Sequence, residues 1–207
     1  HGRGLEGFLA ENCHKLRGIL NGIDYAVYDP KGEGVAYPFD ARSVSRKSEN
    51  KLRLQRELGL EERADTPLIA VVSRLASHKG LDLVCEAAGA LLGEGAQLAV
   101  LGCGERALED FFRRLEAENR HRVCAYIAYD RALATRFYAG CDLFLMPSRS
   151  EPCGLSQMIA SRFGGIPVVR GVGGLYDSIK PYAEREGEIT GNGFVFYEDS
   201  PGALLEA

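Results

Sequence analysis

Several features that mark particular classes of protein are missing from this sequence of 207 residues. No apolar run approaches the roughly 20 residues that a helix needs to cross a bilayer. The net charge is only −4, which argues against a general attraction to nucleic acid or to anionic membranes. We therefore expect neither nucleic acid nor a membrane among the partners, and we expect a cytoplasmic location.

Spacings typical of disulfide frameworks and of metal sites are also missing. The four histidines have no metal-ligand spacing, and the six cysteines show no paired spacing. Three cysteines lie in apolar segments, where cysteine behaves as a small hydrophobic residue: Cys85, Cys124 and Cys141. The sequence therefore predicts reduced thiols and no metal site.

What the sequence does contain, after residue 66, is a regular alternation of apolar strand patterns and amphipathic helix patterns. The composition, 45% hydrophobic and 26% charged, suits a globular domain with a core. Strands that alternate with helices imply a parallel sheet covered on both faces, so we predict an α/β, doubly wound, Rossmann-like fold. The predicted strands are 68–72, 97–101, 123–127, 142–146, 167–170 and 194–197, and the predicted helices are 81–92, 107–118, 131–139, 156–163 and 176–180, with another starting at Pro201.

The residues before this alternation show less pattern. Residues 1–40 are irregular and rich in Gly and Tyr, and residues 18–20 are compatible with a short strand before the turn signal Asn21-Gly22. Residues 42–58 place Arg and Lys side chains among leucines. Because Glu49 and Glu57 interrupt this run and no aromatic residues interleave, a solvated helix face is favoured over a nucleic-acid-binding stripe.

The stretch from Ser148 to Ser156 joins the apolar run 143–146 to a helix pattern that begins near Leu155. Glu151 therefore lies in a turn at the end of a buried strand. In an open α/β sheet, ligands bind where the strands end, and helix N-terminal amides receive anionic groups. On the residues alone, the simpler interpretation is that Glu151 caps or charges the start of the helix.

The sequence of this stretch, however, resembles the signature of the glycogen and starch synthase family of retaining glycosyltransferases. The family string Ser-Arg-x-Glu-Pro-Cys-Gly-Leu-(Ser/Thr)-Gln occurs here as Ser148 to Gln157, with Ser150 where Phe is usual. A broader group of retaining sugar transferases carries a second Glu eight residues after the first, where this chain has Ile159, and this favours the synthases. Further resemblances lie at 20–24, at 72–75 with Lys79-Gly80, and at 173–175.

The resemblance implies the two-lobed GT-B architecture, with this chain as the C-terminal, nucleotide-sugar-binding lobe. It makes residues 1–40 an interlobe or linker segment and residues 41–207 a Rossmann-like domain, within a fragment of a larger enzyme. The chain begins at His1 without an initiator Met and ends abruptly after 203–205, which we interpret as an excised domain. The isolated fragment is therefore expected to be inactive.

By resemblance, the full-length enzyme transfers glucose from ADP-glucose to the 4-hydroxyl of an α-1,4-glucan with retention. ADP-glucose and ADP are the expected ligands of this lobe, and the glucan is expected to bind mainly through the missing N-terminal lobe. No metal cofactor is expected, since the Asp-x-Asp motif of the other common sugar-transferase fold is absent. Double displacement would need a second carboxylate, so the resemblance implies a front-face substitution instead.

The loop 73–80 places Arg74 and Lys79 between a strand and a helix, where a diphosphate leaving group would need positive charge. The alternative is that both are surface charges, and the family's equivalent pair argues against it. The resemblance makes Glu151 the contact to the transferred glucose, with Arg74 and Lys79 as the other catalytic residues. The expected substrate-binding residues are Asn21, Ser73, Tyr129, Cys153, Gly154, Leu155 and Ser156.

Alternatives stay open for several of these residues. Asn21 either reaches the donor or occupies a left-handed turn position. Tyr129 either packs against adenine or packs against the helix that starts at Arg131. The Gly-x-Gly at 102–104 is too weak a signal for a nicotinamide cofactor and is compatible with a tight turn. Cys153 has no base at recognisable spacing, so we interpret it as a small wall residue rather than a nucleophile.

Two other functions compete with the synthase. A non-catalytic nucleotide-binding domain would keep the fold and lose the chemistry, but Arg74, Lys79 and Glu151 are all present. Another retaining GT-B transferase with a different acceptor is disfavoured by Ile159. The choice of ADP over UDP comes only from resemblance to the bacterial and plant form.

Overall fold

The computed structural model describes residues 4–207, and it confirms the predicted α/β fold. Each strand expected after residue 66 is present, and no bound moves by more than one residue. The strands of the main sheet are β1 (Leu68–Val72), β2 (Gln97–Leu101), β3 (Val123–Tyr126), β4 (Leu143–Met146), β5 (Ile166–Arg170) and β8 (Phe194–Phe196). The helices of the domain are α2 (Lys47–Glu57), α3 (Leu81–Gly93), α4 (Arg106–Glu118), α5 (Arg131–Gly140), α6 (Ser156–Arg162), α7 (Gly173–Ser178) and α8 (Pro201–Glu206).

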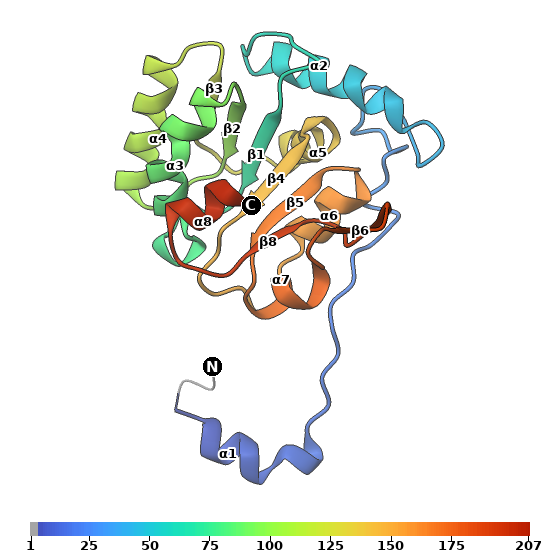
Figure 1. Ribbon diagram of the computed structural model, residues 1–207, viewed down its shortest axis with the longest axis vertical. Helices are drawn as coiled ribbons and strands as arrows, with labels where there is room; N and C mark the ends of the chain where they lie inside the picture. Colours follow the sequence, from blue (N-terminus) through green and yellow to red (C-terminus); the bar gives the residue numbers. More distant parts are fainter. Residues whose placement is uncertain (1–3) are drawn as a thin grey trace.

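The six strands form one parallel sheet in the order β3-β2-β1-β4-β5-β8 (Figure 1). The chain first builds outward from β1 to β3 and then crosses back to place β4 on the other side of β1, where Ile69 lies opposite Leu143. This is the doubly wound order, in which ligands bind outside the carboxyl ends of the strands at the point of reversal. The topology therefore points to the carboxyl ends of β1 and β4.

Alternate residues of β1 face two separate hydrophobic cores. Leu68 and Ala70 pack in the core under α2, α5 and α6, whereas Ile69 and Val71 pack in the core under α3, α4 and α8. The two groups of helices cover opposite faces of the sheet (Figure 1). A strand that is buried on both faces reads as a continuous apolar run, which is why residues 68–72 were recognisable as a strand from the sequence.

The first forty residues divide into a part that lies apart from the domain and a part that packs on it. The short helix α1 (Glu6–Glu11) and the 3-10 turn η1 (Cys13–Lys15) interrupt the segment expected to be irregular, and residues 18–20 form no strand. Helix α1 lies away from the sheet, on the side of the molecule where α7 lies (Figure 1). Val35 and Phe39 are instead buried in the core under α2. The division at residue 40 remains a prediction.

Helix α2 forms where the basic run predicted a helix, but the expected solvated face is wrong for two lysines. Lys47 and Lys51 are only 9% and 4% exposed. The Lys47 ammonium donates to the carbonyl oxygens of Tyr138 and Ala139, at 3.1 and 2.9 Å, in the last turn of α5. Lys51 pairs with Asp142 at 2.6 Å. These partners lie about 90 residues away along the chain, so a local pattern could not reveal them.

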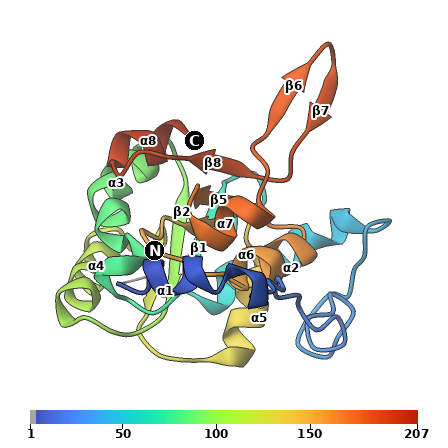
Figure 2. The same ribbon diagram turned by 90° about the horizontal axis from the view of Figure 1, so that it is seen from below.

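Between α7 and β8 the chain forms a hairpin that the sequence did not predict. Strands β6 (Ala183–Arg185) and β7 (Glu188–Thr190) pair antiparallel and project from the body of the domain (Figure 2). The two turn residues, Glu186 and Gly187, both have positive φ, of 53° and 82°. Such a two-residue turn matches the twist of the strands, although its first position usually holds Asn, Asp or Gly.

Candidate functional site

The carboxyl ends of β1 and β2 open into a cavity of about 690 Å³. Its wall includes apolar side chains such as Val72, Leu101 and Ile159, and its polar lining includes Ser73 and Arg74. Helices α5 and α6 also contribute to the wall. The volume falls within the roughly 300–1,000 Å³ that is typical of small-molecule sites. The cavity thus lies at the carboxyl edge of the sheet, next to β1, which is one of the two strands at the reversal point.

The two predicted cations lie on one loop but in different environments. Arg74 is exposed and lines the cavity, whereas Lys79 ends the 3-10 turn η3 (Ser77–Lys79) and its side chain is 20% exposed. The loop is bound to the loop after β2, since the N–H of Leu75 donates to the carbonyl oxygen of Cys103 at 3.0 Å. The two loops lie so close that a Cβ at Gly102 would overlap the carbonyl oxygen of Ser73. Close backbone approach, and not the tight turn with which the sequence was compatible, therefore explains the Gly-x-Gly at 102–104.

Aromatic side chains occupy both the rim and the wall of the cavity. Tyr129 lines it with 88% of the residue exposed, so the alternative in which its ring packs against α5 is wrong. Tyr138, on α5, lines the same cavity and donates from its hydroxyl to Ser156 Oγ at 3.2 Å. Burial raises the pKa of Tyr138 to about 12, so this hydroxyl keeps its proton at neutral pH.

The carboxylate of Glu151 forms an ion pair with Lys79, with 2.6 Å between Oε2 and Nζ. The Glu151 side chain is only 10% exposed, so the pair is partly shielded from solvent. Ser148 Oγ donates to the same oxygen at 3.4 Å. No side chain caps the start of α6. The interpretation that Glu151 caps this helix is therefore wrong, because its carboxylate is turned toward the loop after β1.

The backbone that follows Glu151 is held by residues outside the predicted site. Gln157 is fully buried and donates from Nε2 to the carbonyl oxygens of Cys153 and Gly154, at 3.1 and 2.8 Å. Gly154 has a φ of 71°, a conformation that few residues other than glycine adopt. The N–H of Gly174 donates to the carbonyl oxygen of Glu151 at 2.9 Å, and a Cβ at Gly174 would overlap Cys153. The start of α7 therefore supports the motif loop from behind.

Of the ten predicted site residues, five line the cavity, four lie on loops that border it, and Asn21 does neither. The residues that line the cavity are Ser73, Arg74, Tyr129, Leu155 and Ser156. Lys79, Glu151, Cys153 and Gly154 are not among the lining residues, but they lie on the loops that also carry Arg74 and Leu155. Asn21 is exposed in the N-terminal segment and does not line the cavity. Its φ is not positive, so the left-handed turn is wrong, and its contact with a donor remains a prediction.

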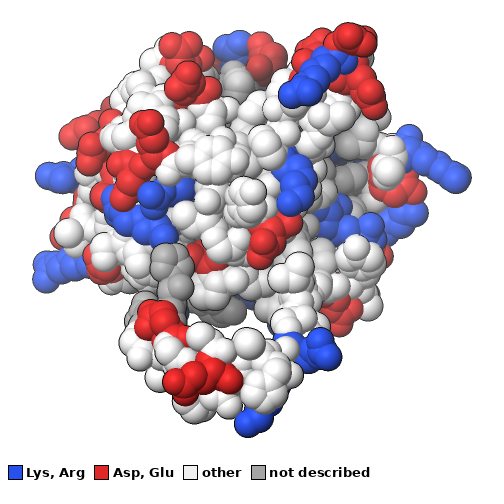
Figure 3. Space-filling view, turned by 60° about the horizontal axis from the view of Figure 1, so that its bottom comes forward, with Lys and Arg blue, Asp and Glu red and all other residues white. Residues whose placement is uncertain are grey.

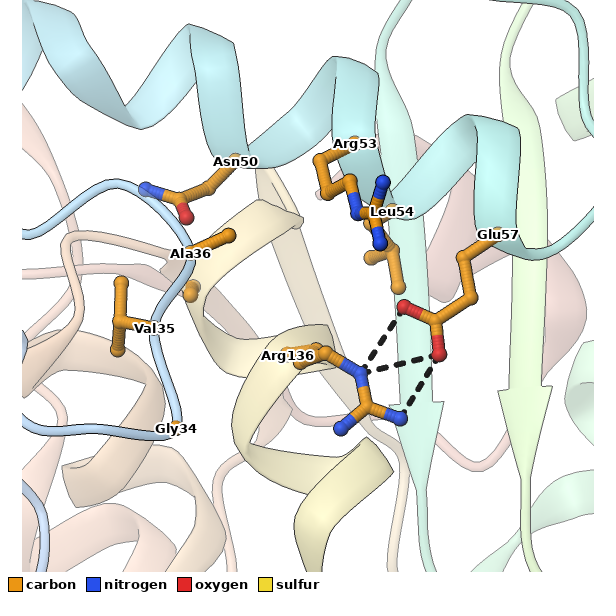
Figure 4. Close-up of a pocket in the computed structure, with 9 residues that line it drawn as sticks. Gly34, Val35, Ala36, Asn50, Arg53, Leu54, Glu57 and Arg136 are labelled. Atoms are coloured by element: carbon orange, nitrogen blue, oxygen red, sulfur yellow. Dashed lines mark hydrogen bonds and ion pairs between the residues drawn. The ribbon is translucent and has the colours of Figure 1, made fainter.

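Two other hollows fit a ligand at the strand ends less well. The hollow between residues 34–36, α2 and α5 has a volume of only about 10 Å³, too small for a nucleotide, and the Glu57–Arg136 ion pair borders it at 2.8 Å (Figure 4). A wider groove of about 860 Å³ lies beside Lys31 and Gly164. Since Gly164 lies two residues before β5, this groove lies at the amino ends of the strands, away from the reversal point.

Within residues 4–207, no three His, Cys, Asp or Glu side chains gather as a metal site would require, and the six cysteines are free. No helix in the described part of the chain is long and apolar enough to cross a membrane. Figure 3 shows acidic and basic side chains interspersed on the face that it presents.

Sequence reasoning missed several residues that shape this site. Tyr28, Thr135 and Tyr138 line the cavity, and only Tyr138 carried a signal, since a tyrosine on an apolar helix face needs a polar partner. Arg149 belongs to the signature string but had no assigned role. Its guanidinium joins two carboxylates that lie 67 and 50 residues away along the chain.

The fold and the site define a class: a doubly wound lobe with a nucleotide-sized cavity, and with cations and a single motif carboxylate at the strand ends. The sequence profile of the family described as Glycosyl transferases group 1 matches residues 57–207. The chain therefore belongs to the group 1 glycosyl transferases.

Glycogen synthases are among its similar relatives. The glycogen synthase of Moorella thermoacetica is 45% identical over 207 residues, which is 100% of this chain and 42% of the relative. The glycogen synthase of Bacillus subtilis is 48% identical over 198 residues, which is 95% of this chain and 40% of the relative. These similarities confirm the resemblance to the synthases, and the chain spans about two fifths of their length.

Solved structures confirm the architecture. The catalytic domain of starch synthase IV from Arabidopsis thaliana, bound to ADP and acarbose, superposes with a TM-score of 0.92 at 35% identity, covering 100% of this chain and 43% of that one. The C-terminal domain of a group 1 glycosyl transferase from Francisella tularensis gives a TM-score of 0.58 at 18% identity, covering 89% of this chain and 85% of that one. The latter likeness shows the fold alone, and the former confirms the expected C-terminal lobe of GT-B type.

Proposed function

We propose that this chain is the donor-binding lobe of a glycogen synthase. The full-length enzyme would transfer glucose from ADP-glucose to the 4-hydroxyl of an α-1,4-glucan with retention. One observation carries the proposal: the ends of β1 and β4 place the Lys79–Glu151 ion pair on the loops that border a nucleotide-sized cavity. The similarity to glycogen synthases, and to a starch synthase bound to ADP, supports the choice of reaction and donor.

In this proposal the two cations of the loop after β1, Arg74 and Lys79, bind the diphosphate of the donor. As the bond between the anomeric carbon and the diphosphate oxygen breaks, that oxygen gains negative charge. Arg74 offers a planar fork for phosphate oxygens and Lys79 a compact charge, and both would stabilise the leaving group. They would take the role that a divalent metal has in other sugar transferases. Tyr129, exposed at the cavity rim, would stack on the adenine.

The motif loop would hold the sugar. Glu151 would face the glucose while positive charge develops at its anomeric carbon, and the backbone amides of Cys153, Gly154 and Leu155 would bind sugar hydroxyls or phosphate oxygens. With a single carboxylate in the motif, we favour a front-face substitution. The acceptor hydroxyl would attack on the side from which the diphosphate leaves, and its proton would pass to the diphosphate.

Turnover by the full-length enzyme that contains this lobe tests the proposal. The enzyme is supplied with a glucan primer and either ADP-glucose or UDP-glucose, and the released nucleotide and the anomeric configuration of the product are measured. We expect turnover of ADP-glucose and an α-linked product. Binding of ADP without transfer from either donor would support a non-catalytic nucleotide-binding domain instead, and transfer only to another acceptor would support a different retaining transferase.

A further inference from the structure

Arg149 connects three parts of the domain at the carboxyl end of β4. Its guanidinium forms a bidentate pair with Asp82, in the first turn of α3, with both N–O distances at 2.7 Å. Its Nε donates to Asp199, between β8 and α8, at 2.8 Å. Helices α3 and α8 lie side by side (Figures 1 and 2). Arg149 therefore anchors the motif loop to the layer that these two helices form.

The same side chain reaches the turn that carries Lys79. One guanidinium N–H donates to the carbonyl oxygen of Ser77 at 3.0 Å, and the backbone N–H of Arg149 donates to the carbonyl oxygen of His78 at 3.0 Å. The carboxylate of Glu105, directly before α4, also accepts from the N–H and the hydroxyl of Ser77, at 2.8 and 3.1 Å. Glu105 therefore binds the N–H of Ser77 and Arg149 binds its carbonyl group, which fixes the turn η3 two residues before Lys79.

These contacts occupy most of the hydrogen-bonding capacity of Arg149. The guanidinium has five N–H donors, and four of them make the contacts to Asp82, Asp199 and Ser77. A bidentate phosphate contact would need two free donors in one plane. The side chain is 31% exposed, so it is also partly withdrawn from solvent. The geometry therefore fits a residue that holds other residues in place better than it fits a phosphate ligand.

We propose that Arg149 is a positioning residue of the donor site, which ties the loop that carries Glu151 to the turn that carries Lys79. This inference rests on the proposed function, in which Lys79 binds the diphosphate of the donor. Glu151 lies two residues after Arg149, and Lys79 lies two residues after Ser77. The bond between Arg149 and Ser77 therefore spans the same two loops as the Lys79–Glu151 pair. Lysine cannot replace this fork, because a single ammonium cannot reach acceptors on three elements in one plane.

A double-mutant cycle on this chain tests the inference, with ADP and adenosine as calorimetric ligands. We expect Arg149→Gln to weaken ADP binding about 10-fold, because Lys79 loses its position, and to leave adenosine binding unchanged. In the Lys79→Ala background, Arg149→Gln should cause no further loss. Arg149→Lys should resemble Arg149→Gln. Asp82→Asn, which weakens the fork from α3 without altering the motif loop, should act in the same direction and provides a second variant should Arg149→Gln fold poorly.

Arg56→Gln is the matched control, because Arg56 forms a comparable bidentate pair with Glu62 on the segment before β1. This substitution should leave the affinities for ADP and for adenosine unchanged. Additive losses from Arg149→Gln and Lys79→Ala would show that Arg149 binds the phosphate itself, and equal losses of ADP and adenosine would show a merely structural role. Either result, or unchanged ADP affinity in Arg149→Gln and Asp82→Asn, would overturn the inference about Arg149 and leave the proposed donor site intact. A wild-type chain that does not bind ADP would overturn the donor site itself, and the inference with it.

Discussion

The ion pair between Lys79 and Glu151 makes the two charges of the site depend on each other. At 2.6 Å, with side chains 20% and 10% exposed, each charge is compensated mainly by its partner. Removing one member of a shielded pair leaves the other uncompensated, and this costs more than the loss of a single contact. A substitution at Lys79 therefore changes the site in two ways, whereas a substitution at the exposed Arg74 changes it in one.

We expect Arg74→Ala and Lys79→Ala each to weaken ADP binding to this chain, with the larger loss at Lys79. A charge-assisted hydrogen bond contributes roughly 1.5–3 kcal/mol, which corresponds to an affinity about 10- to 100-fold lower. In Lys79→Ala the uncompensated carboxylate of Glu151 should also repel the diphosphate. Calorimetric titration with ADP measures both losses, which should shrink at high salt.

Adenosine is the matched control ligand because it carries no phosphate, and its affinity should change little in either variant. Adding Glu151→Gln to Lys79→Ala should recover part of the ADP affinity, since it removes the repelling charge. ADP affinity that is equal in the wild type and in both single variants would place the phosphate site elsewhere.

At Glu151 we expect a different signature. Glu151→Gln in the full-length enzyme should leave ADP affinity nearly intact while it lowers kcat strongly, because the carboxylate should matter most when charge develops at the anomeric carbon. Steady-state kinetics with ADP-glucose and a glucan primer, together with ADP titration, separate the two effects. A near-normal kcat would show that Glu151 has only a structural role beside Lys79.

At the scale of elements, the sequence predicted those that their own residues determine. Strand β1 was predicted with its observed bounds because both of its faces are buried, so that its apolar run is continuous. Helix α7 was placed three residues too late, at Tyr176 instead of Gly173. A glycine pair indicates a break in a local pattern, whereas here it lets the helix start pack against the backbone of Glu151 and Cys153. The β6–β7 hairpin was missed because residues 183–190 lack alternating apolar residues.

The residues of the site likewise divide into those that the sequence predicted and those that only the fold reveals. Two features of the sequence predicted site residues: the carboxyl ends of the predicted strands, where ligands bind, and the resemblance to the synthase family. Together they indicated Arg74, Lys79, Glu151 and Tyr129, since each lies just after a predicted strand or before a predicted helix. The supports of the site could not be found from the sequence. Arg149 and Glu105 act through partners between 28 and 72 residues away, and only the packed fold brings those partners within reach.

Helix α2 offers an element-scale prediction. Lys47→Met keeps an unbranched apolar stem but removes the donor to two carbonyl oxygens in the last turn of α5. Buried acceptors left unpaired cost about 1–3 kcal/mol. Burial lowers the pKa of Lys47 and so opposes its charge, which offsets part of this cost. We therefore expect the free energy of unfolding to decrease by an amount near the lower end of that range. Urea denaturation measures the change.

Arg53→Met, at an exposed position of the same helix, is the matched control and should shift the free energy of unfolding by no more than about 0.5 kcal/mol. Equal stability of Lys47→Met and the wild type would show that the carbonyl contacts of Lys47 only balance the cost of burying its charge.

For the whole molecule, the cavity at the strand ends and the segment that precedes the domain lead to the same expectation. The cavity opens at the strand ends, and α1 lies on that side of the molecule, apart from the domain (Figure 1). Large apolar residues of this first segment are exposed, such as Phe8 at 65% and Ile19 at 91%. The glycogen synthases that resemble this chain are more than twice as long. A two-lobed parent enzyme would supply the opposing wall of the cleft and the acceptor surface.

We therefore expect the 207-residue chain to bind ADP but to transfer no glucose from ADP-glucose to a glucan primer. Holding donor and acceptor in register contributes about 7–11 kcal/mol to lowering a barrier, and the acceptor would be held mainly by the other lobe. The assay measures ADP release and primer elongation, with the full-length enzyme as the positive control. The Glu151→Gln form of the chain serves as the second control. If the purified chain elongated the primer and its Glu151→Gln form did not, the activity would belong to this lobe and not to a contaminating synthase, and the two-lobe requirement would be wrong.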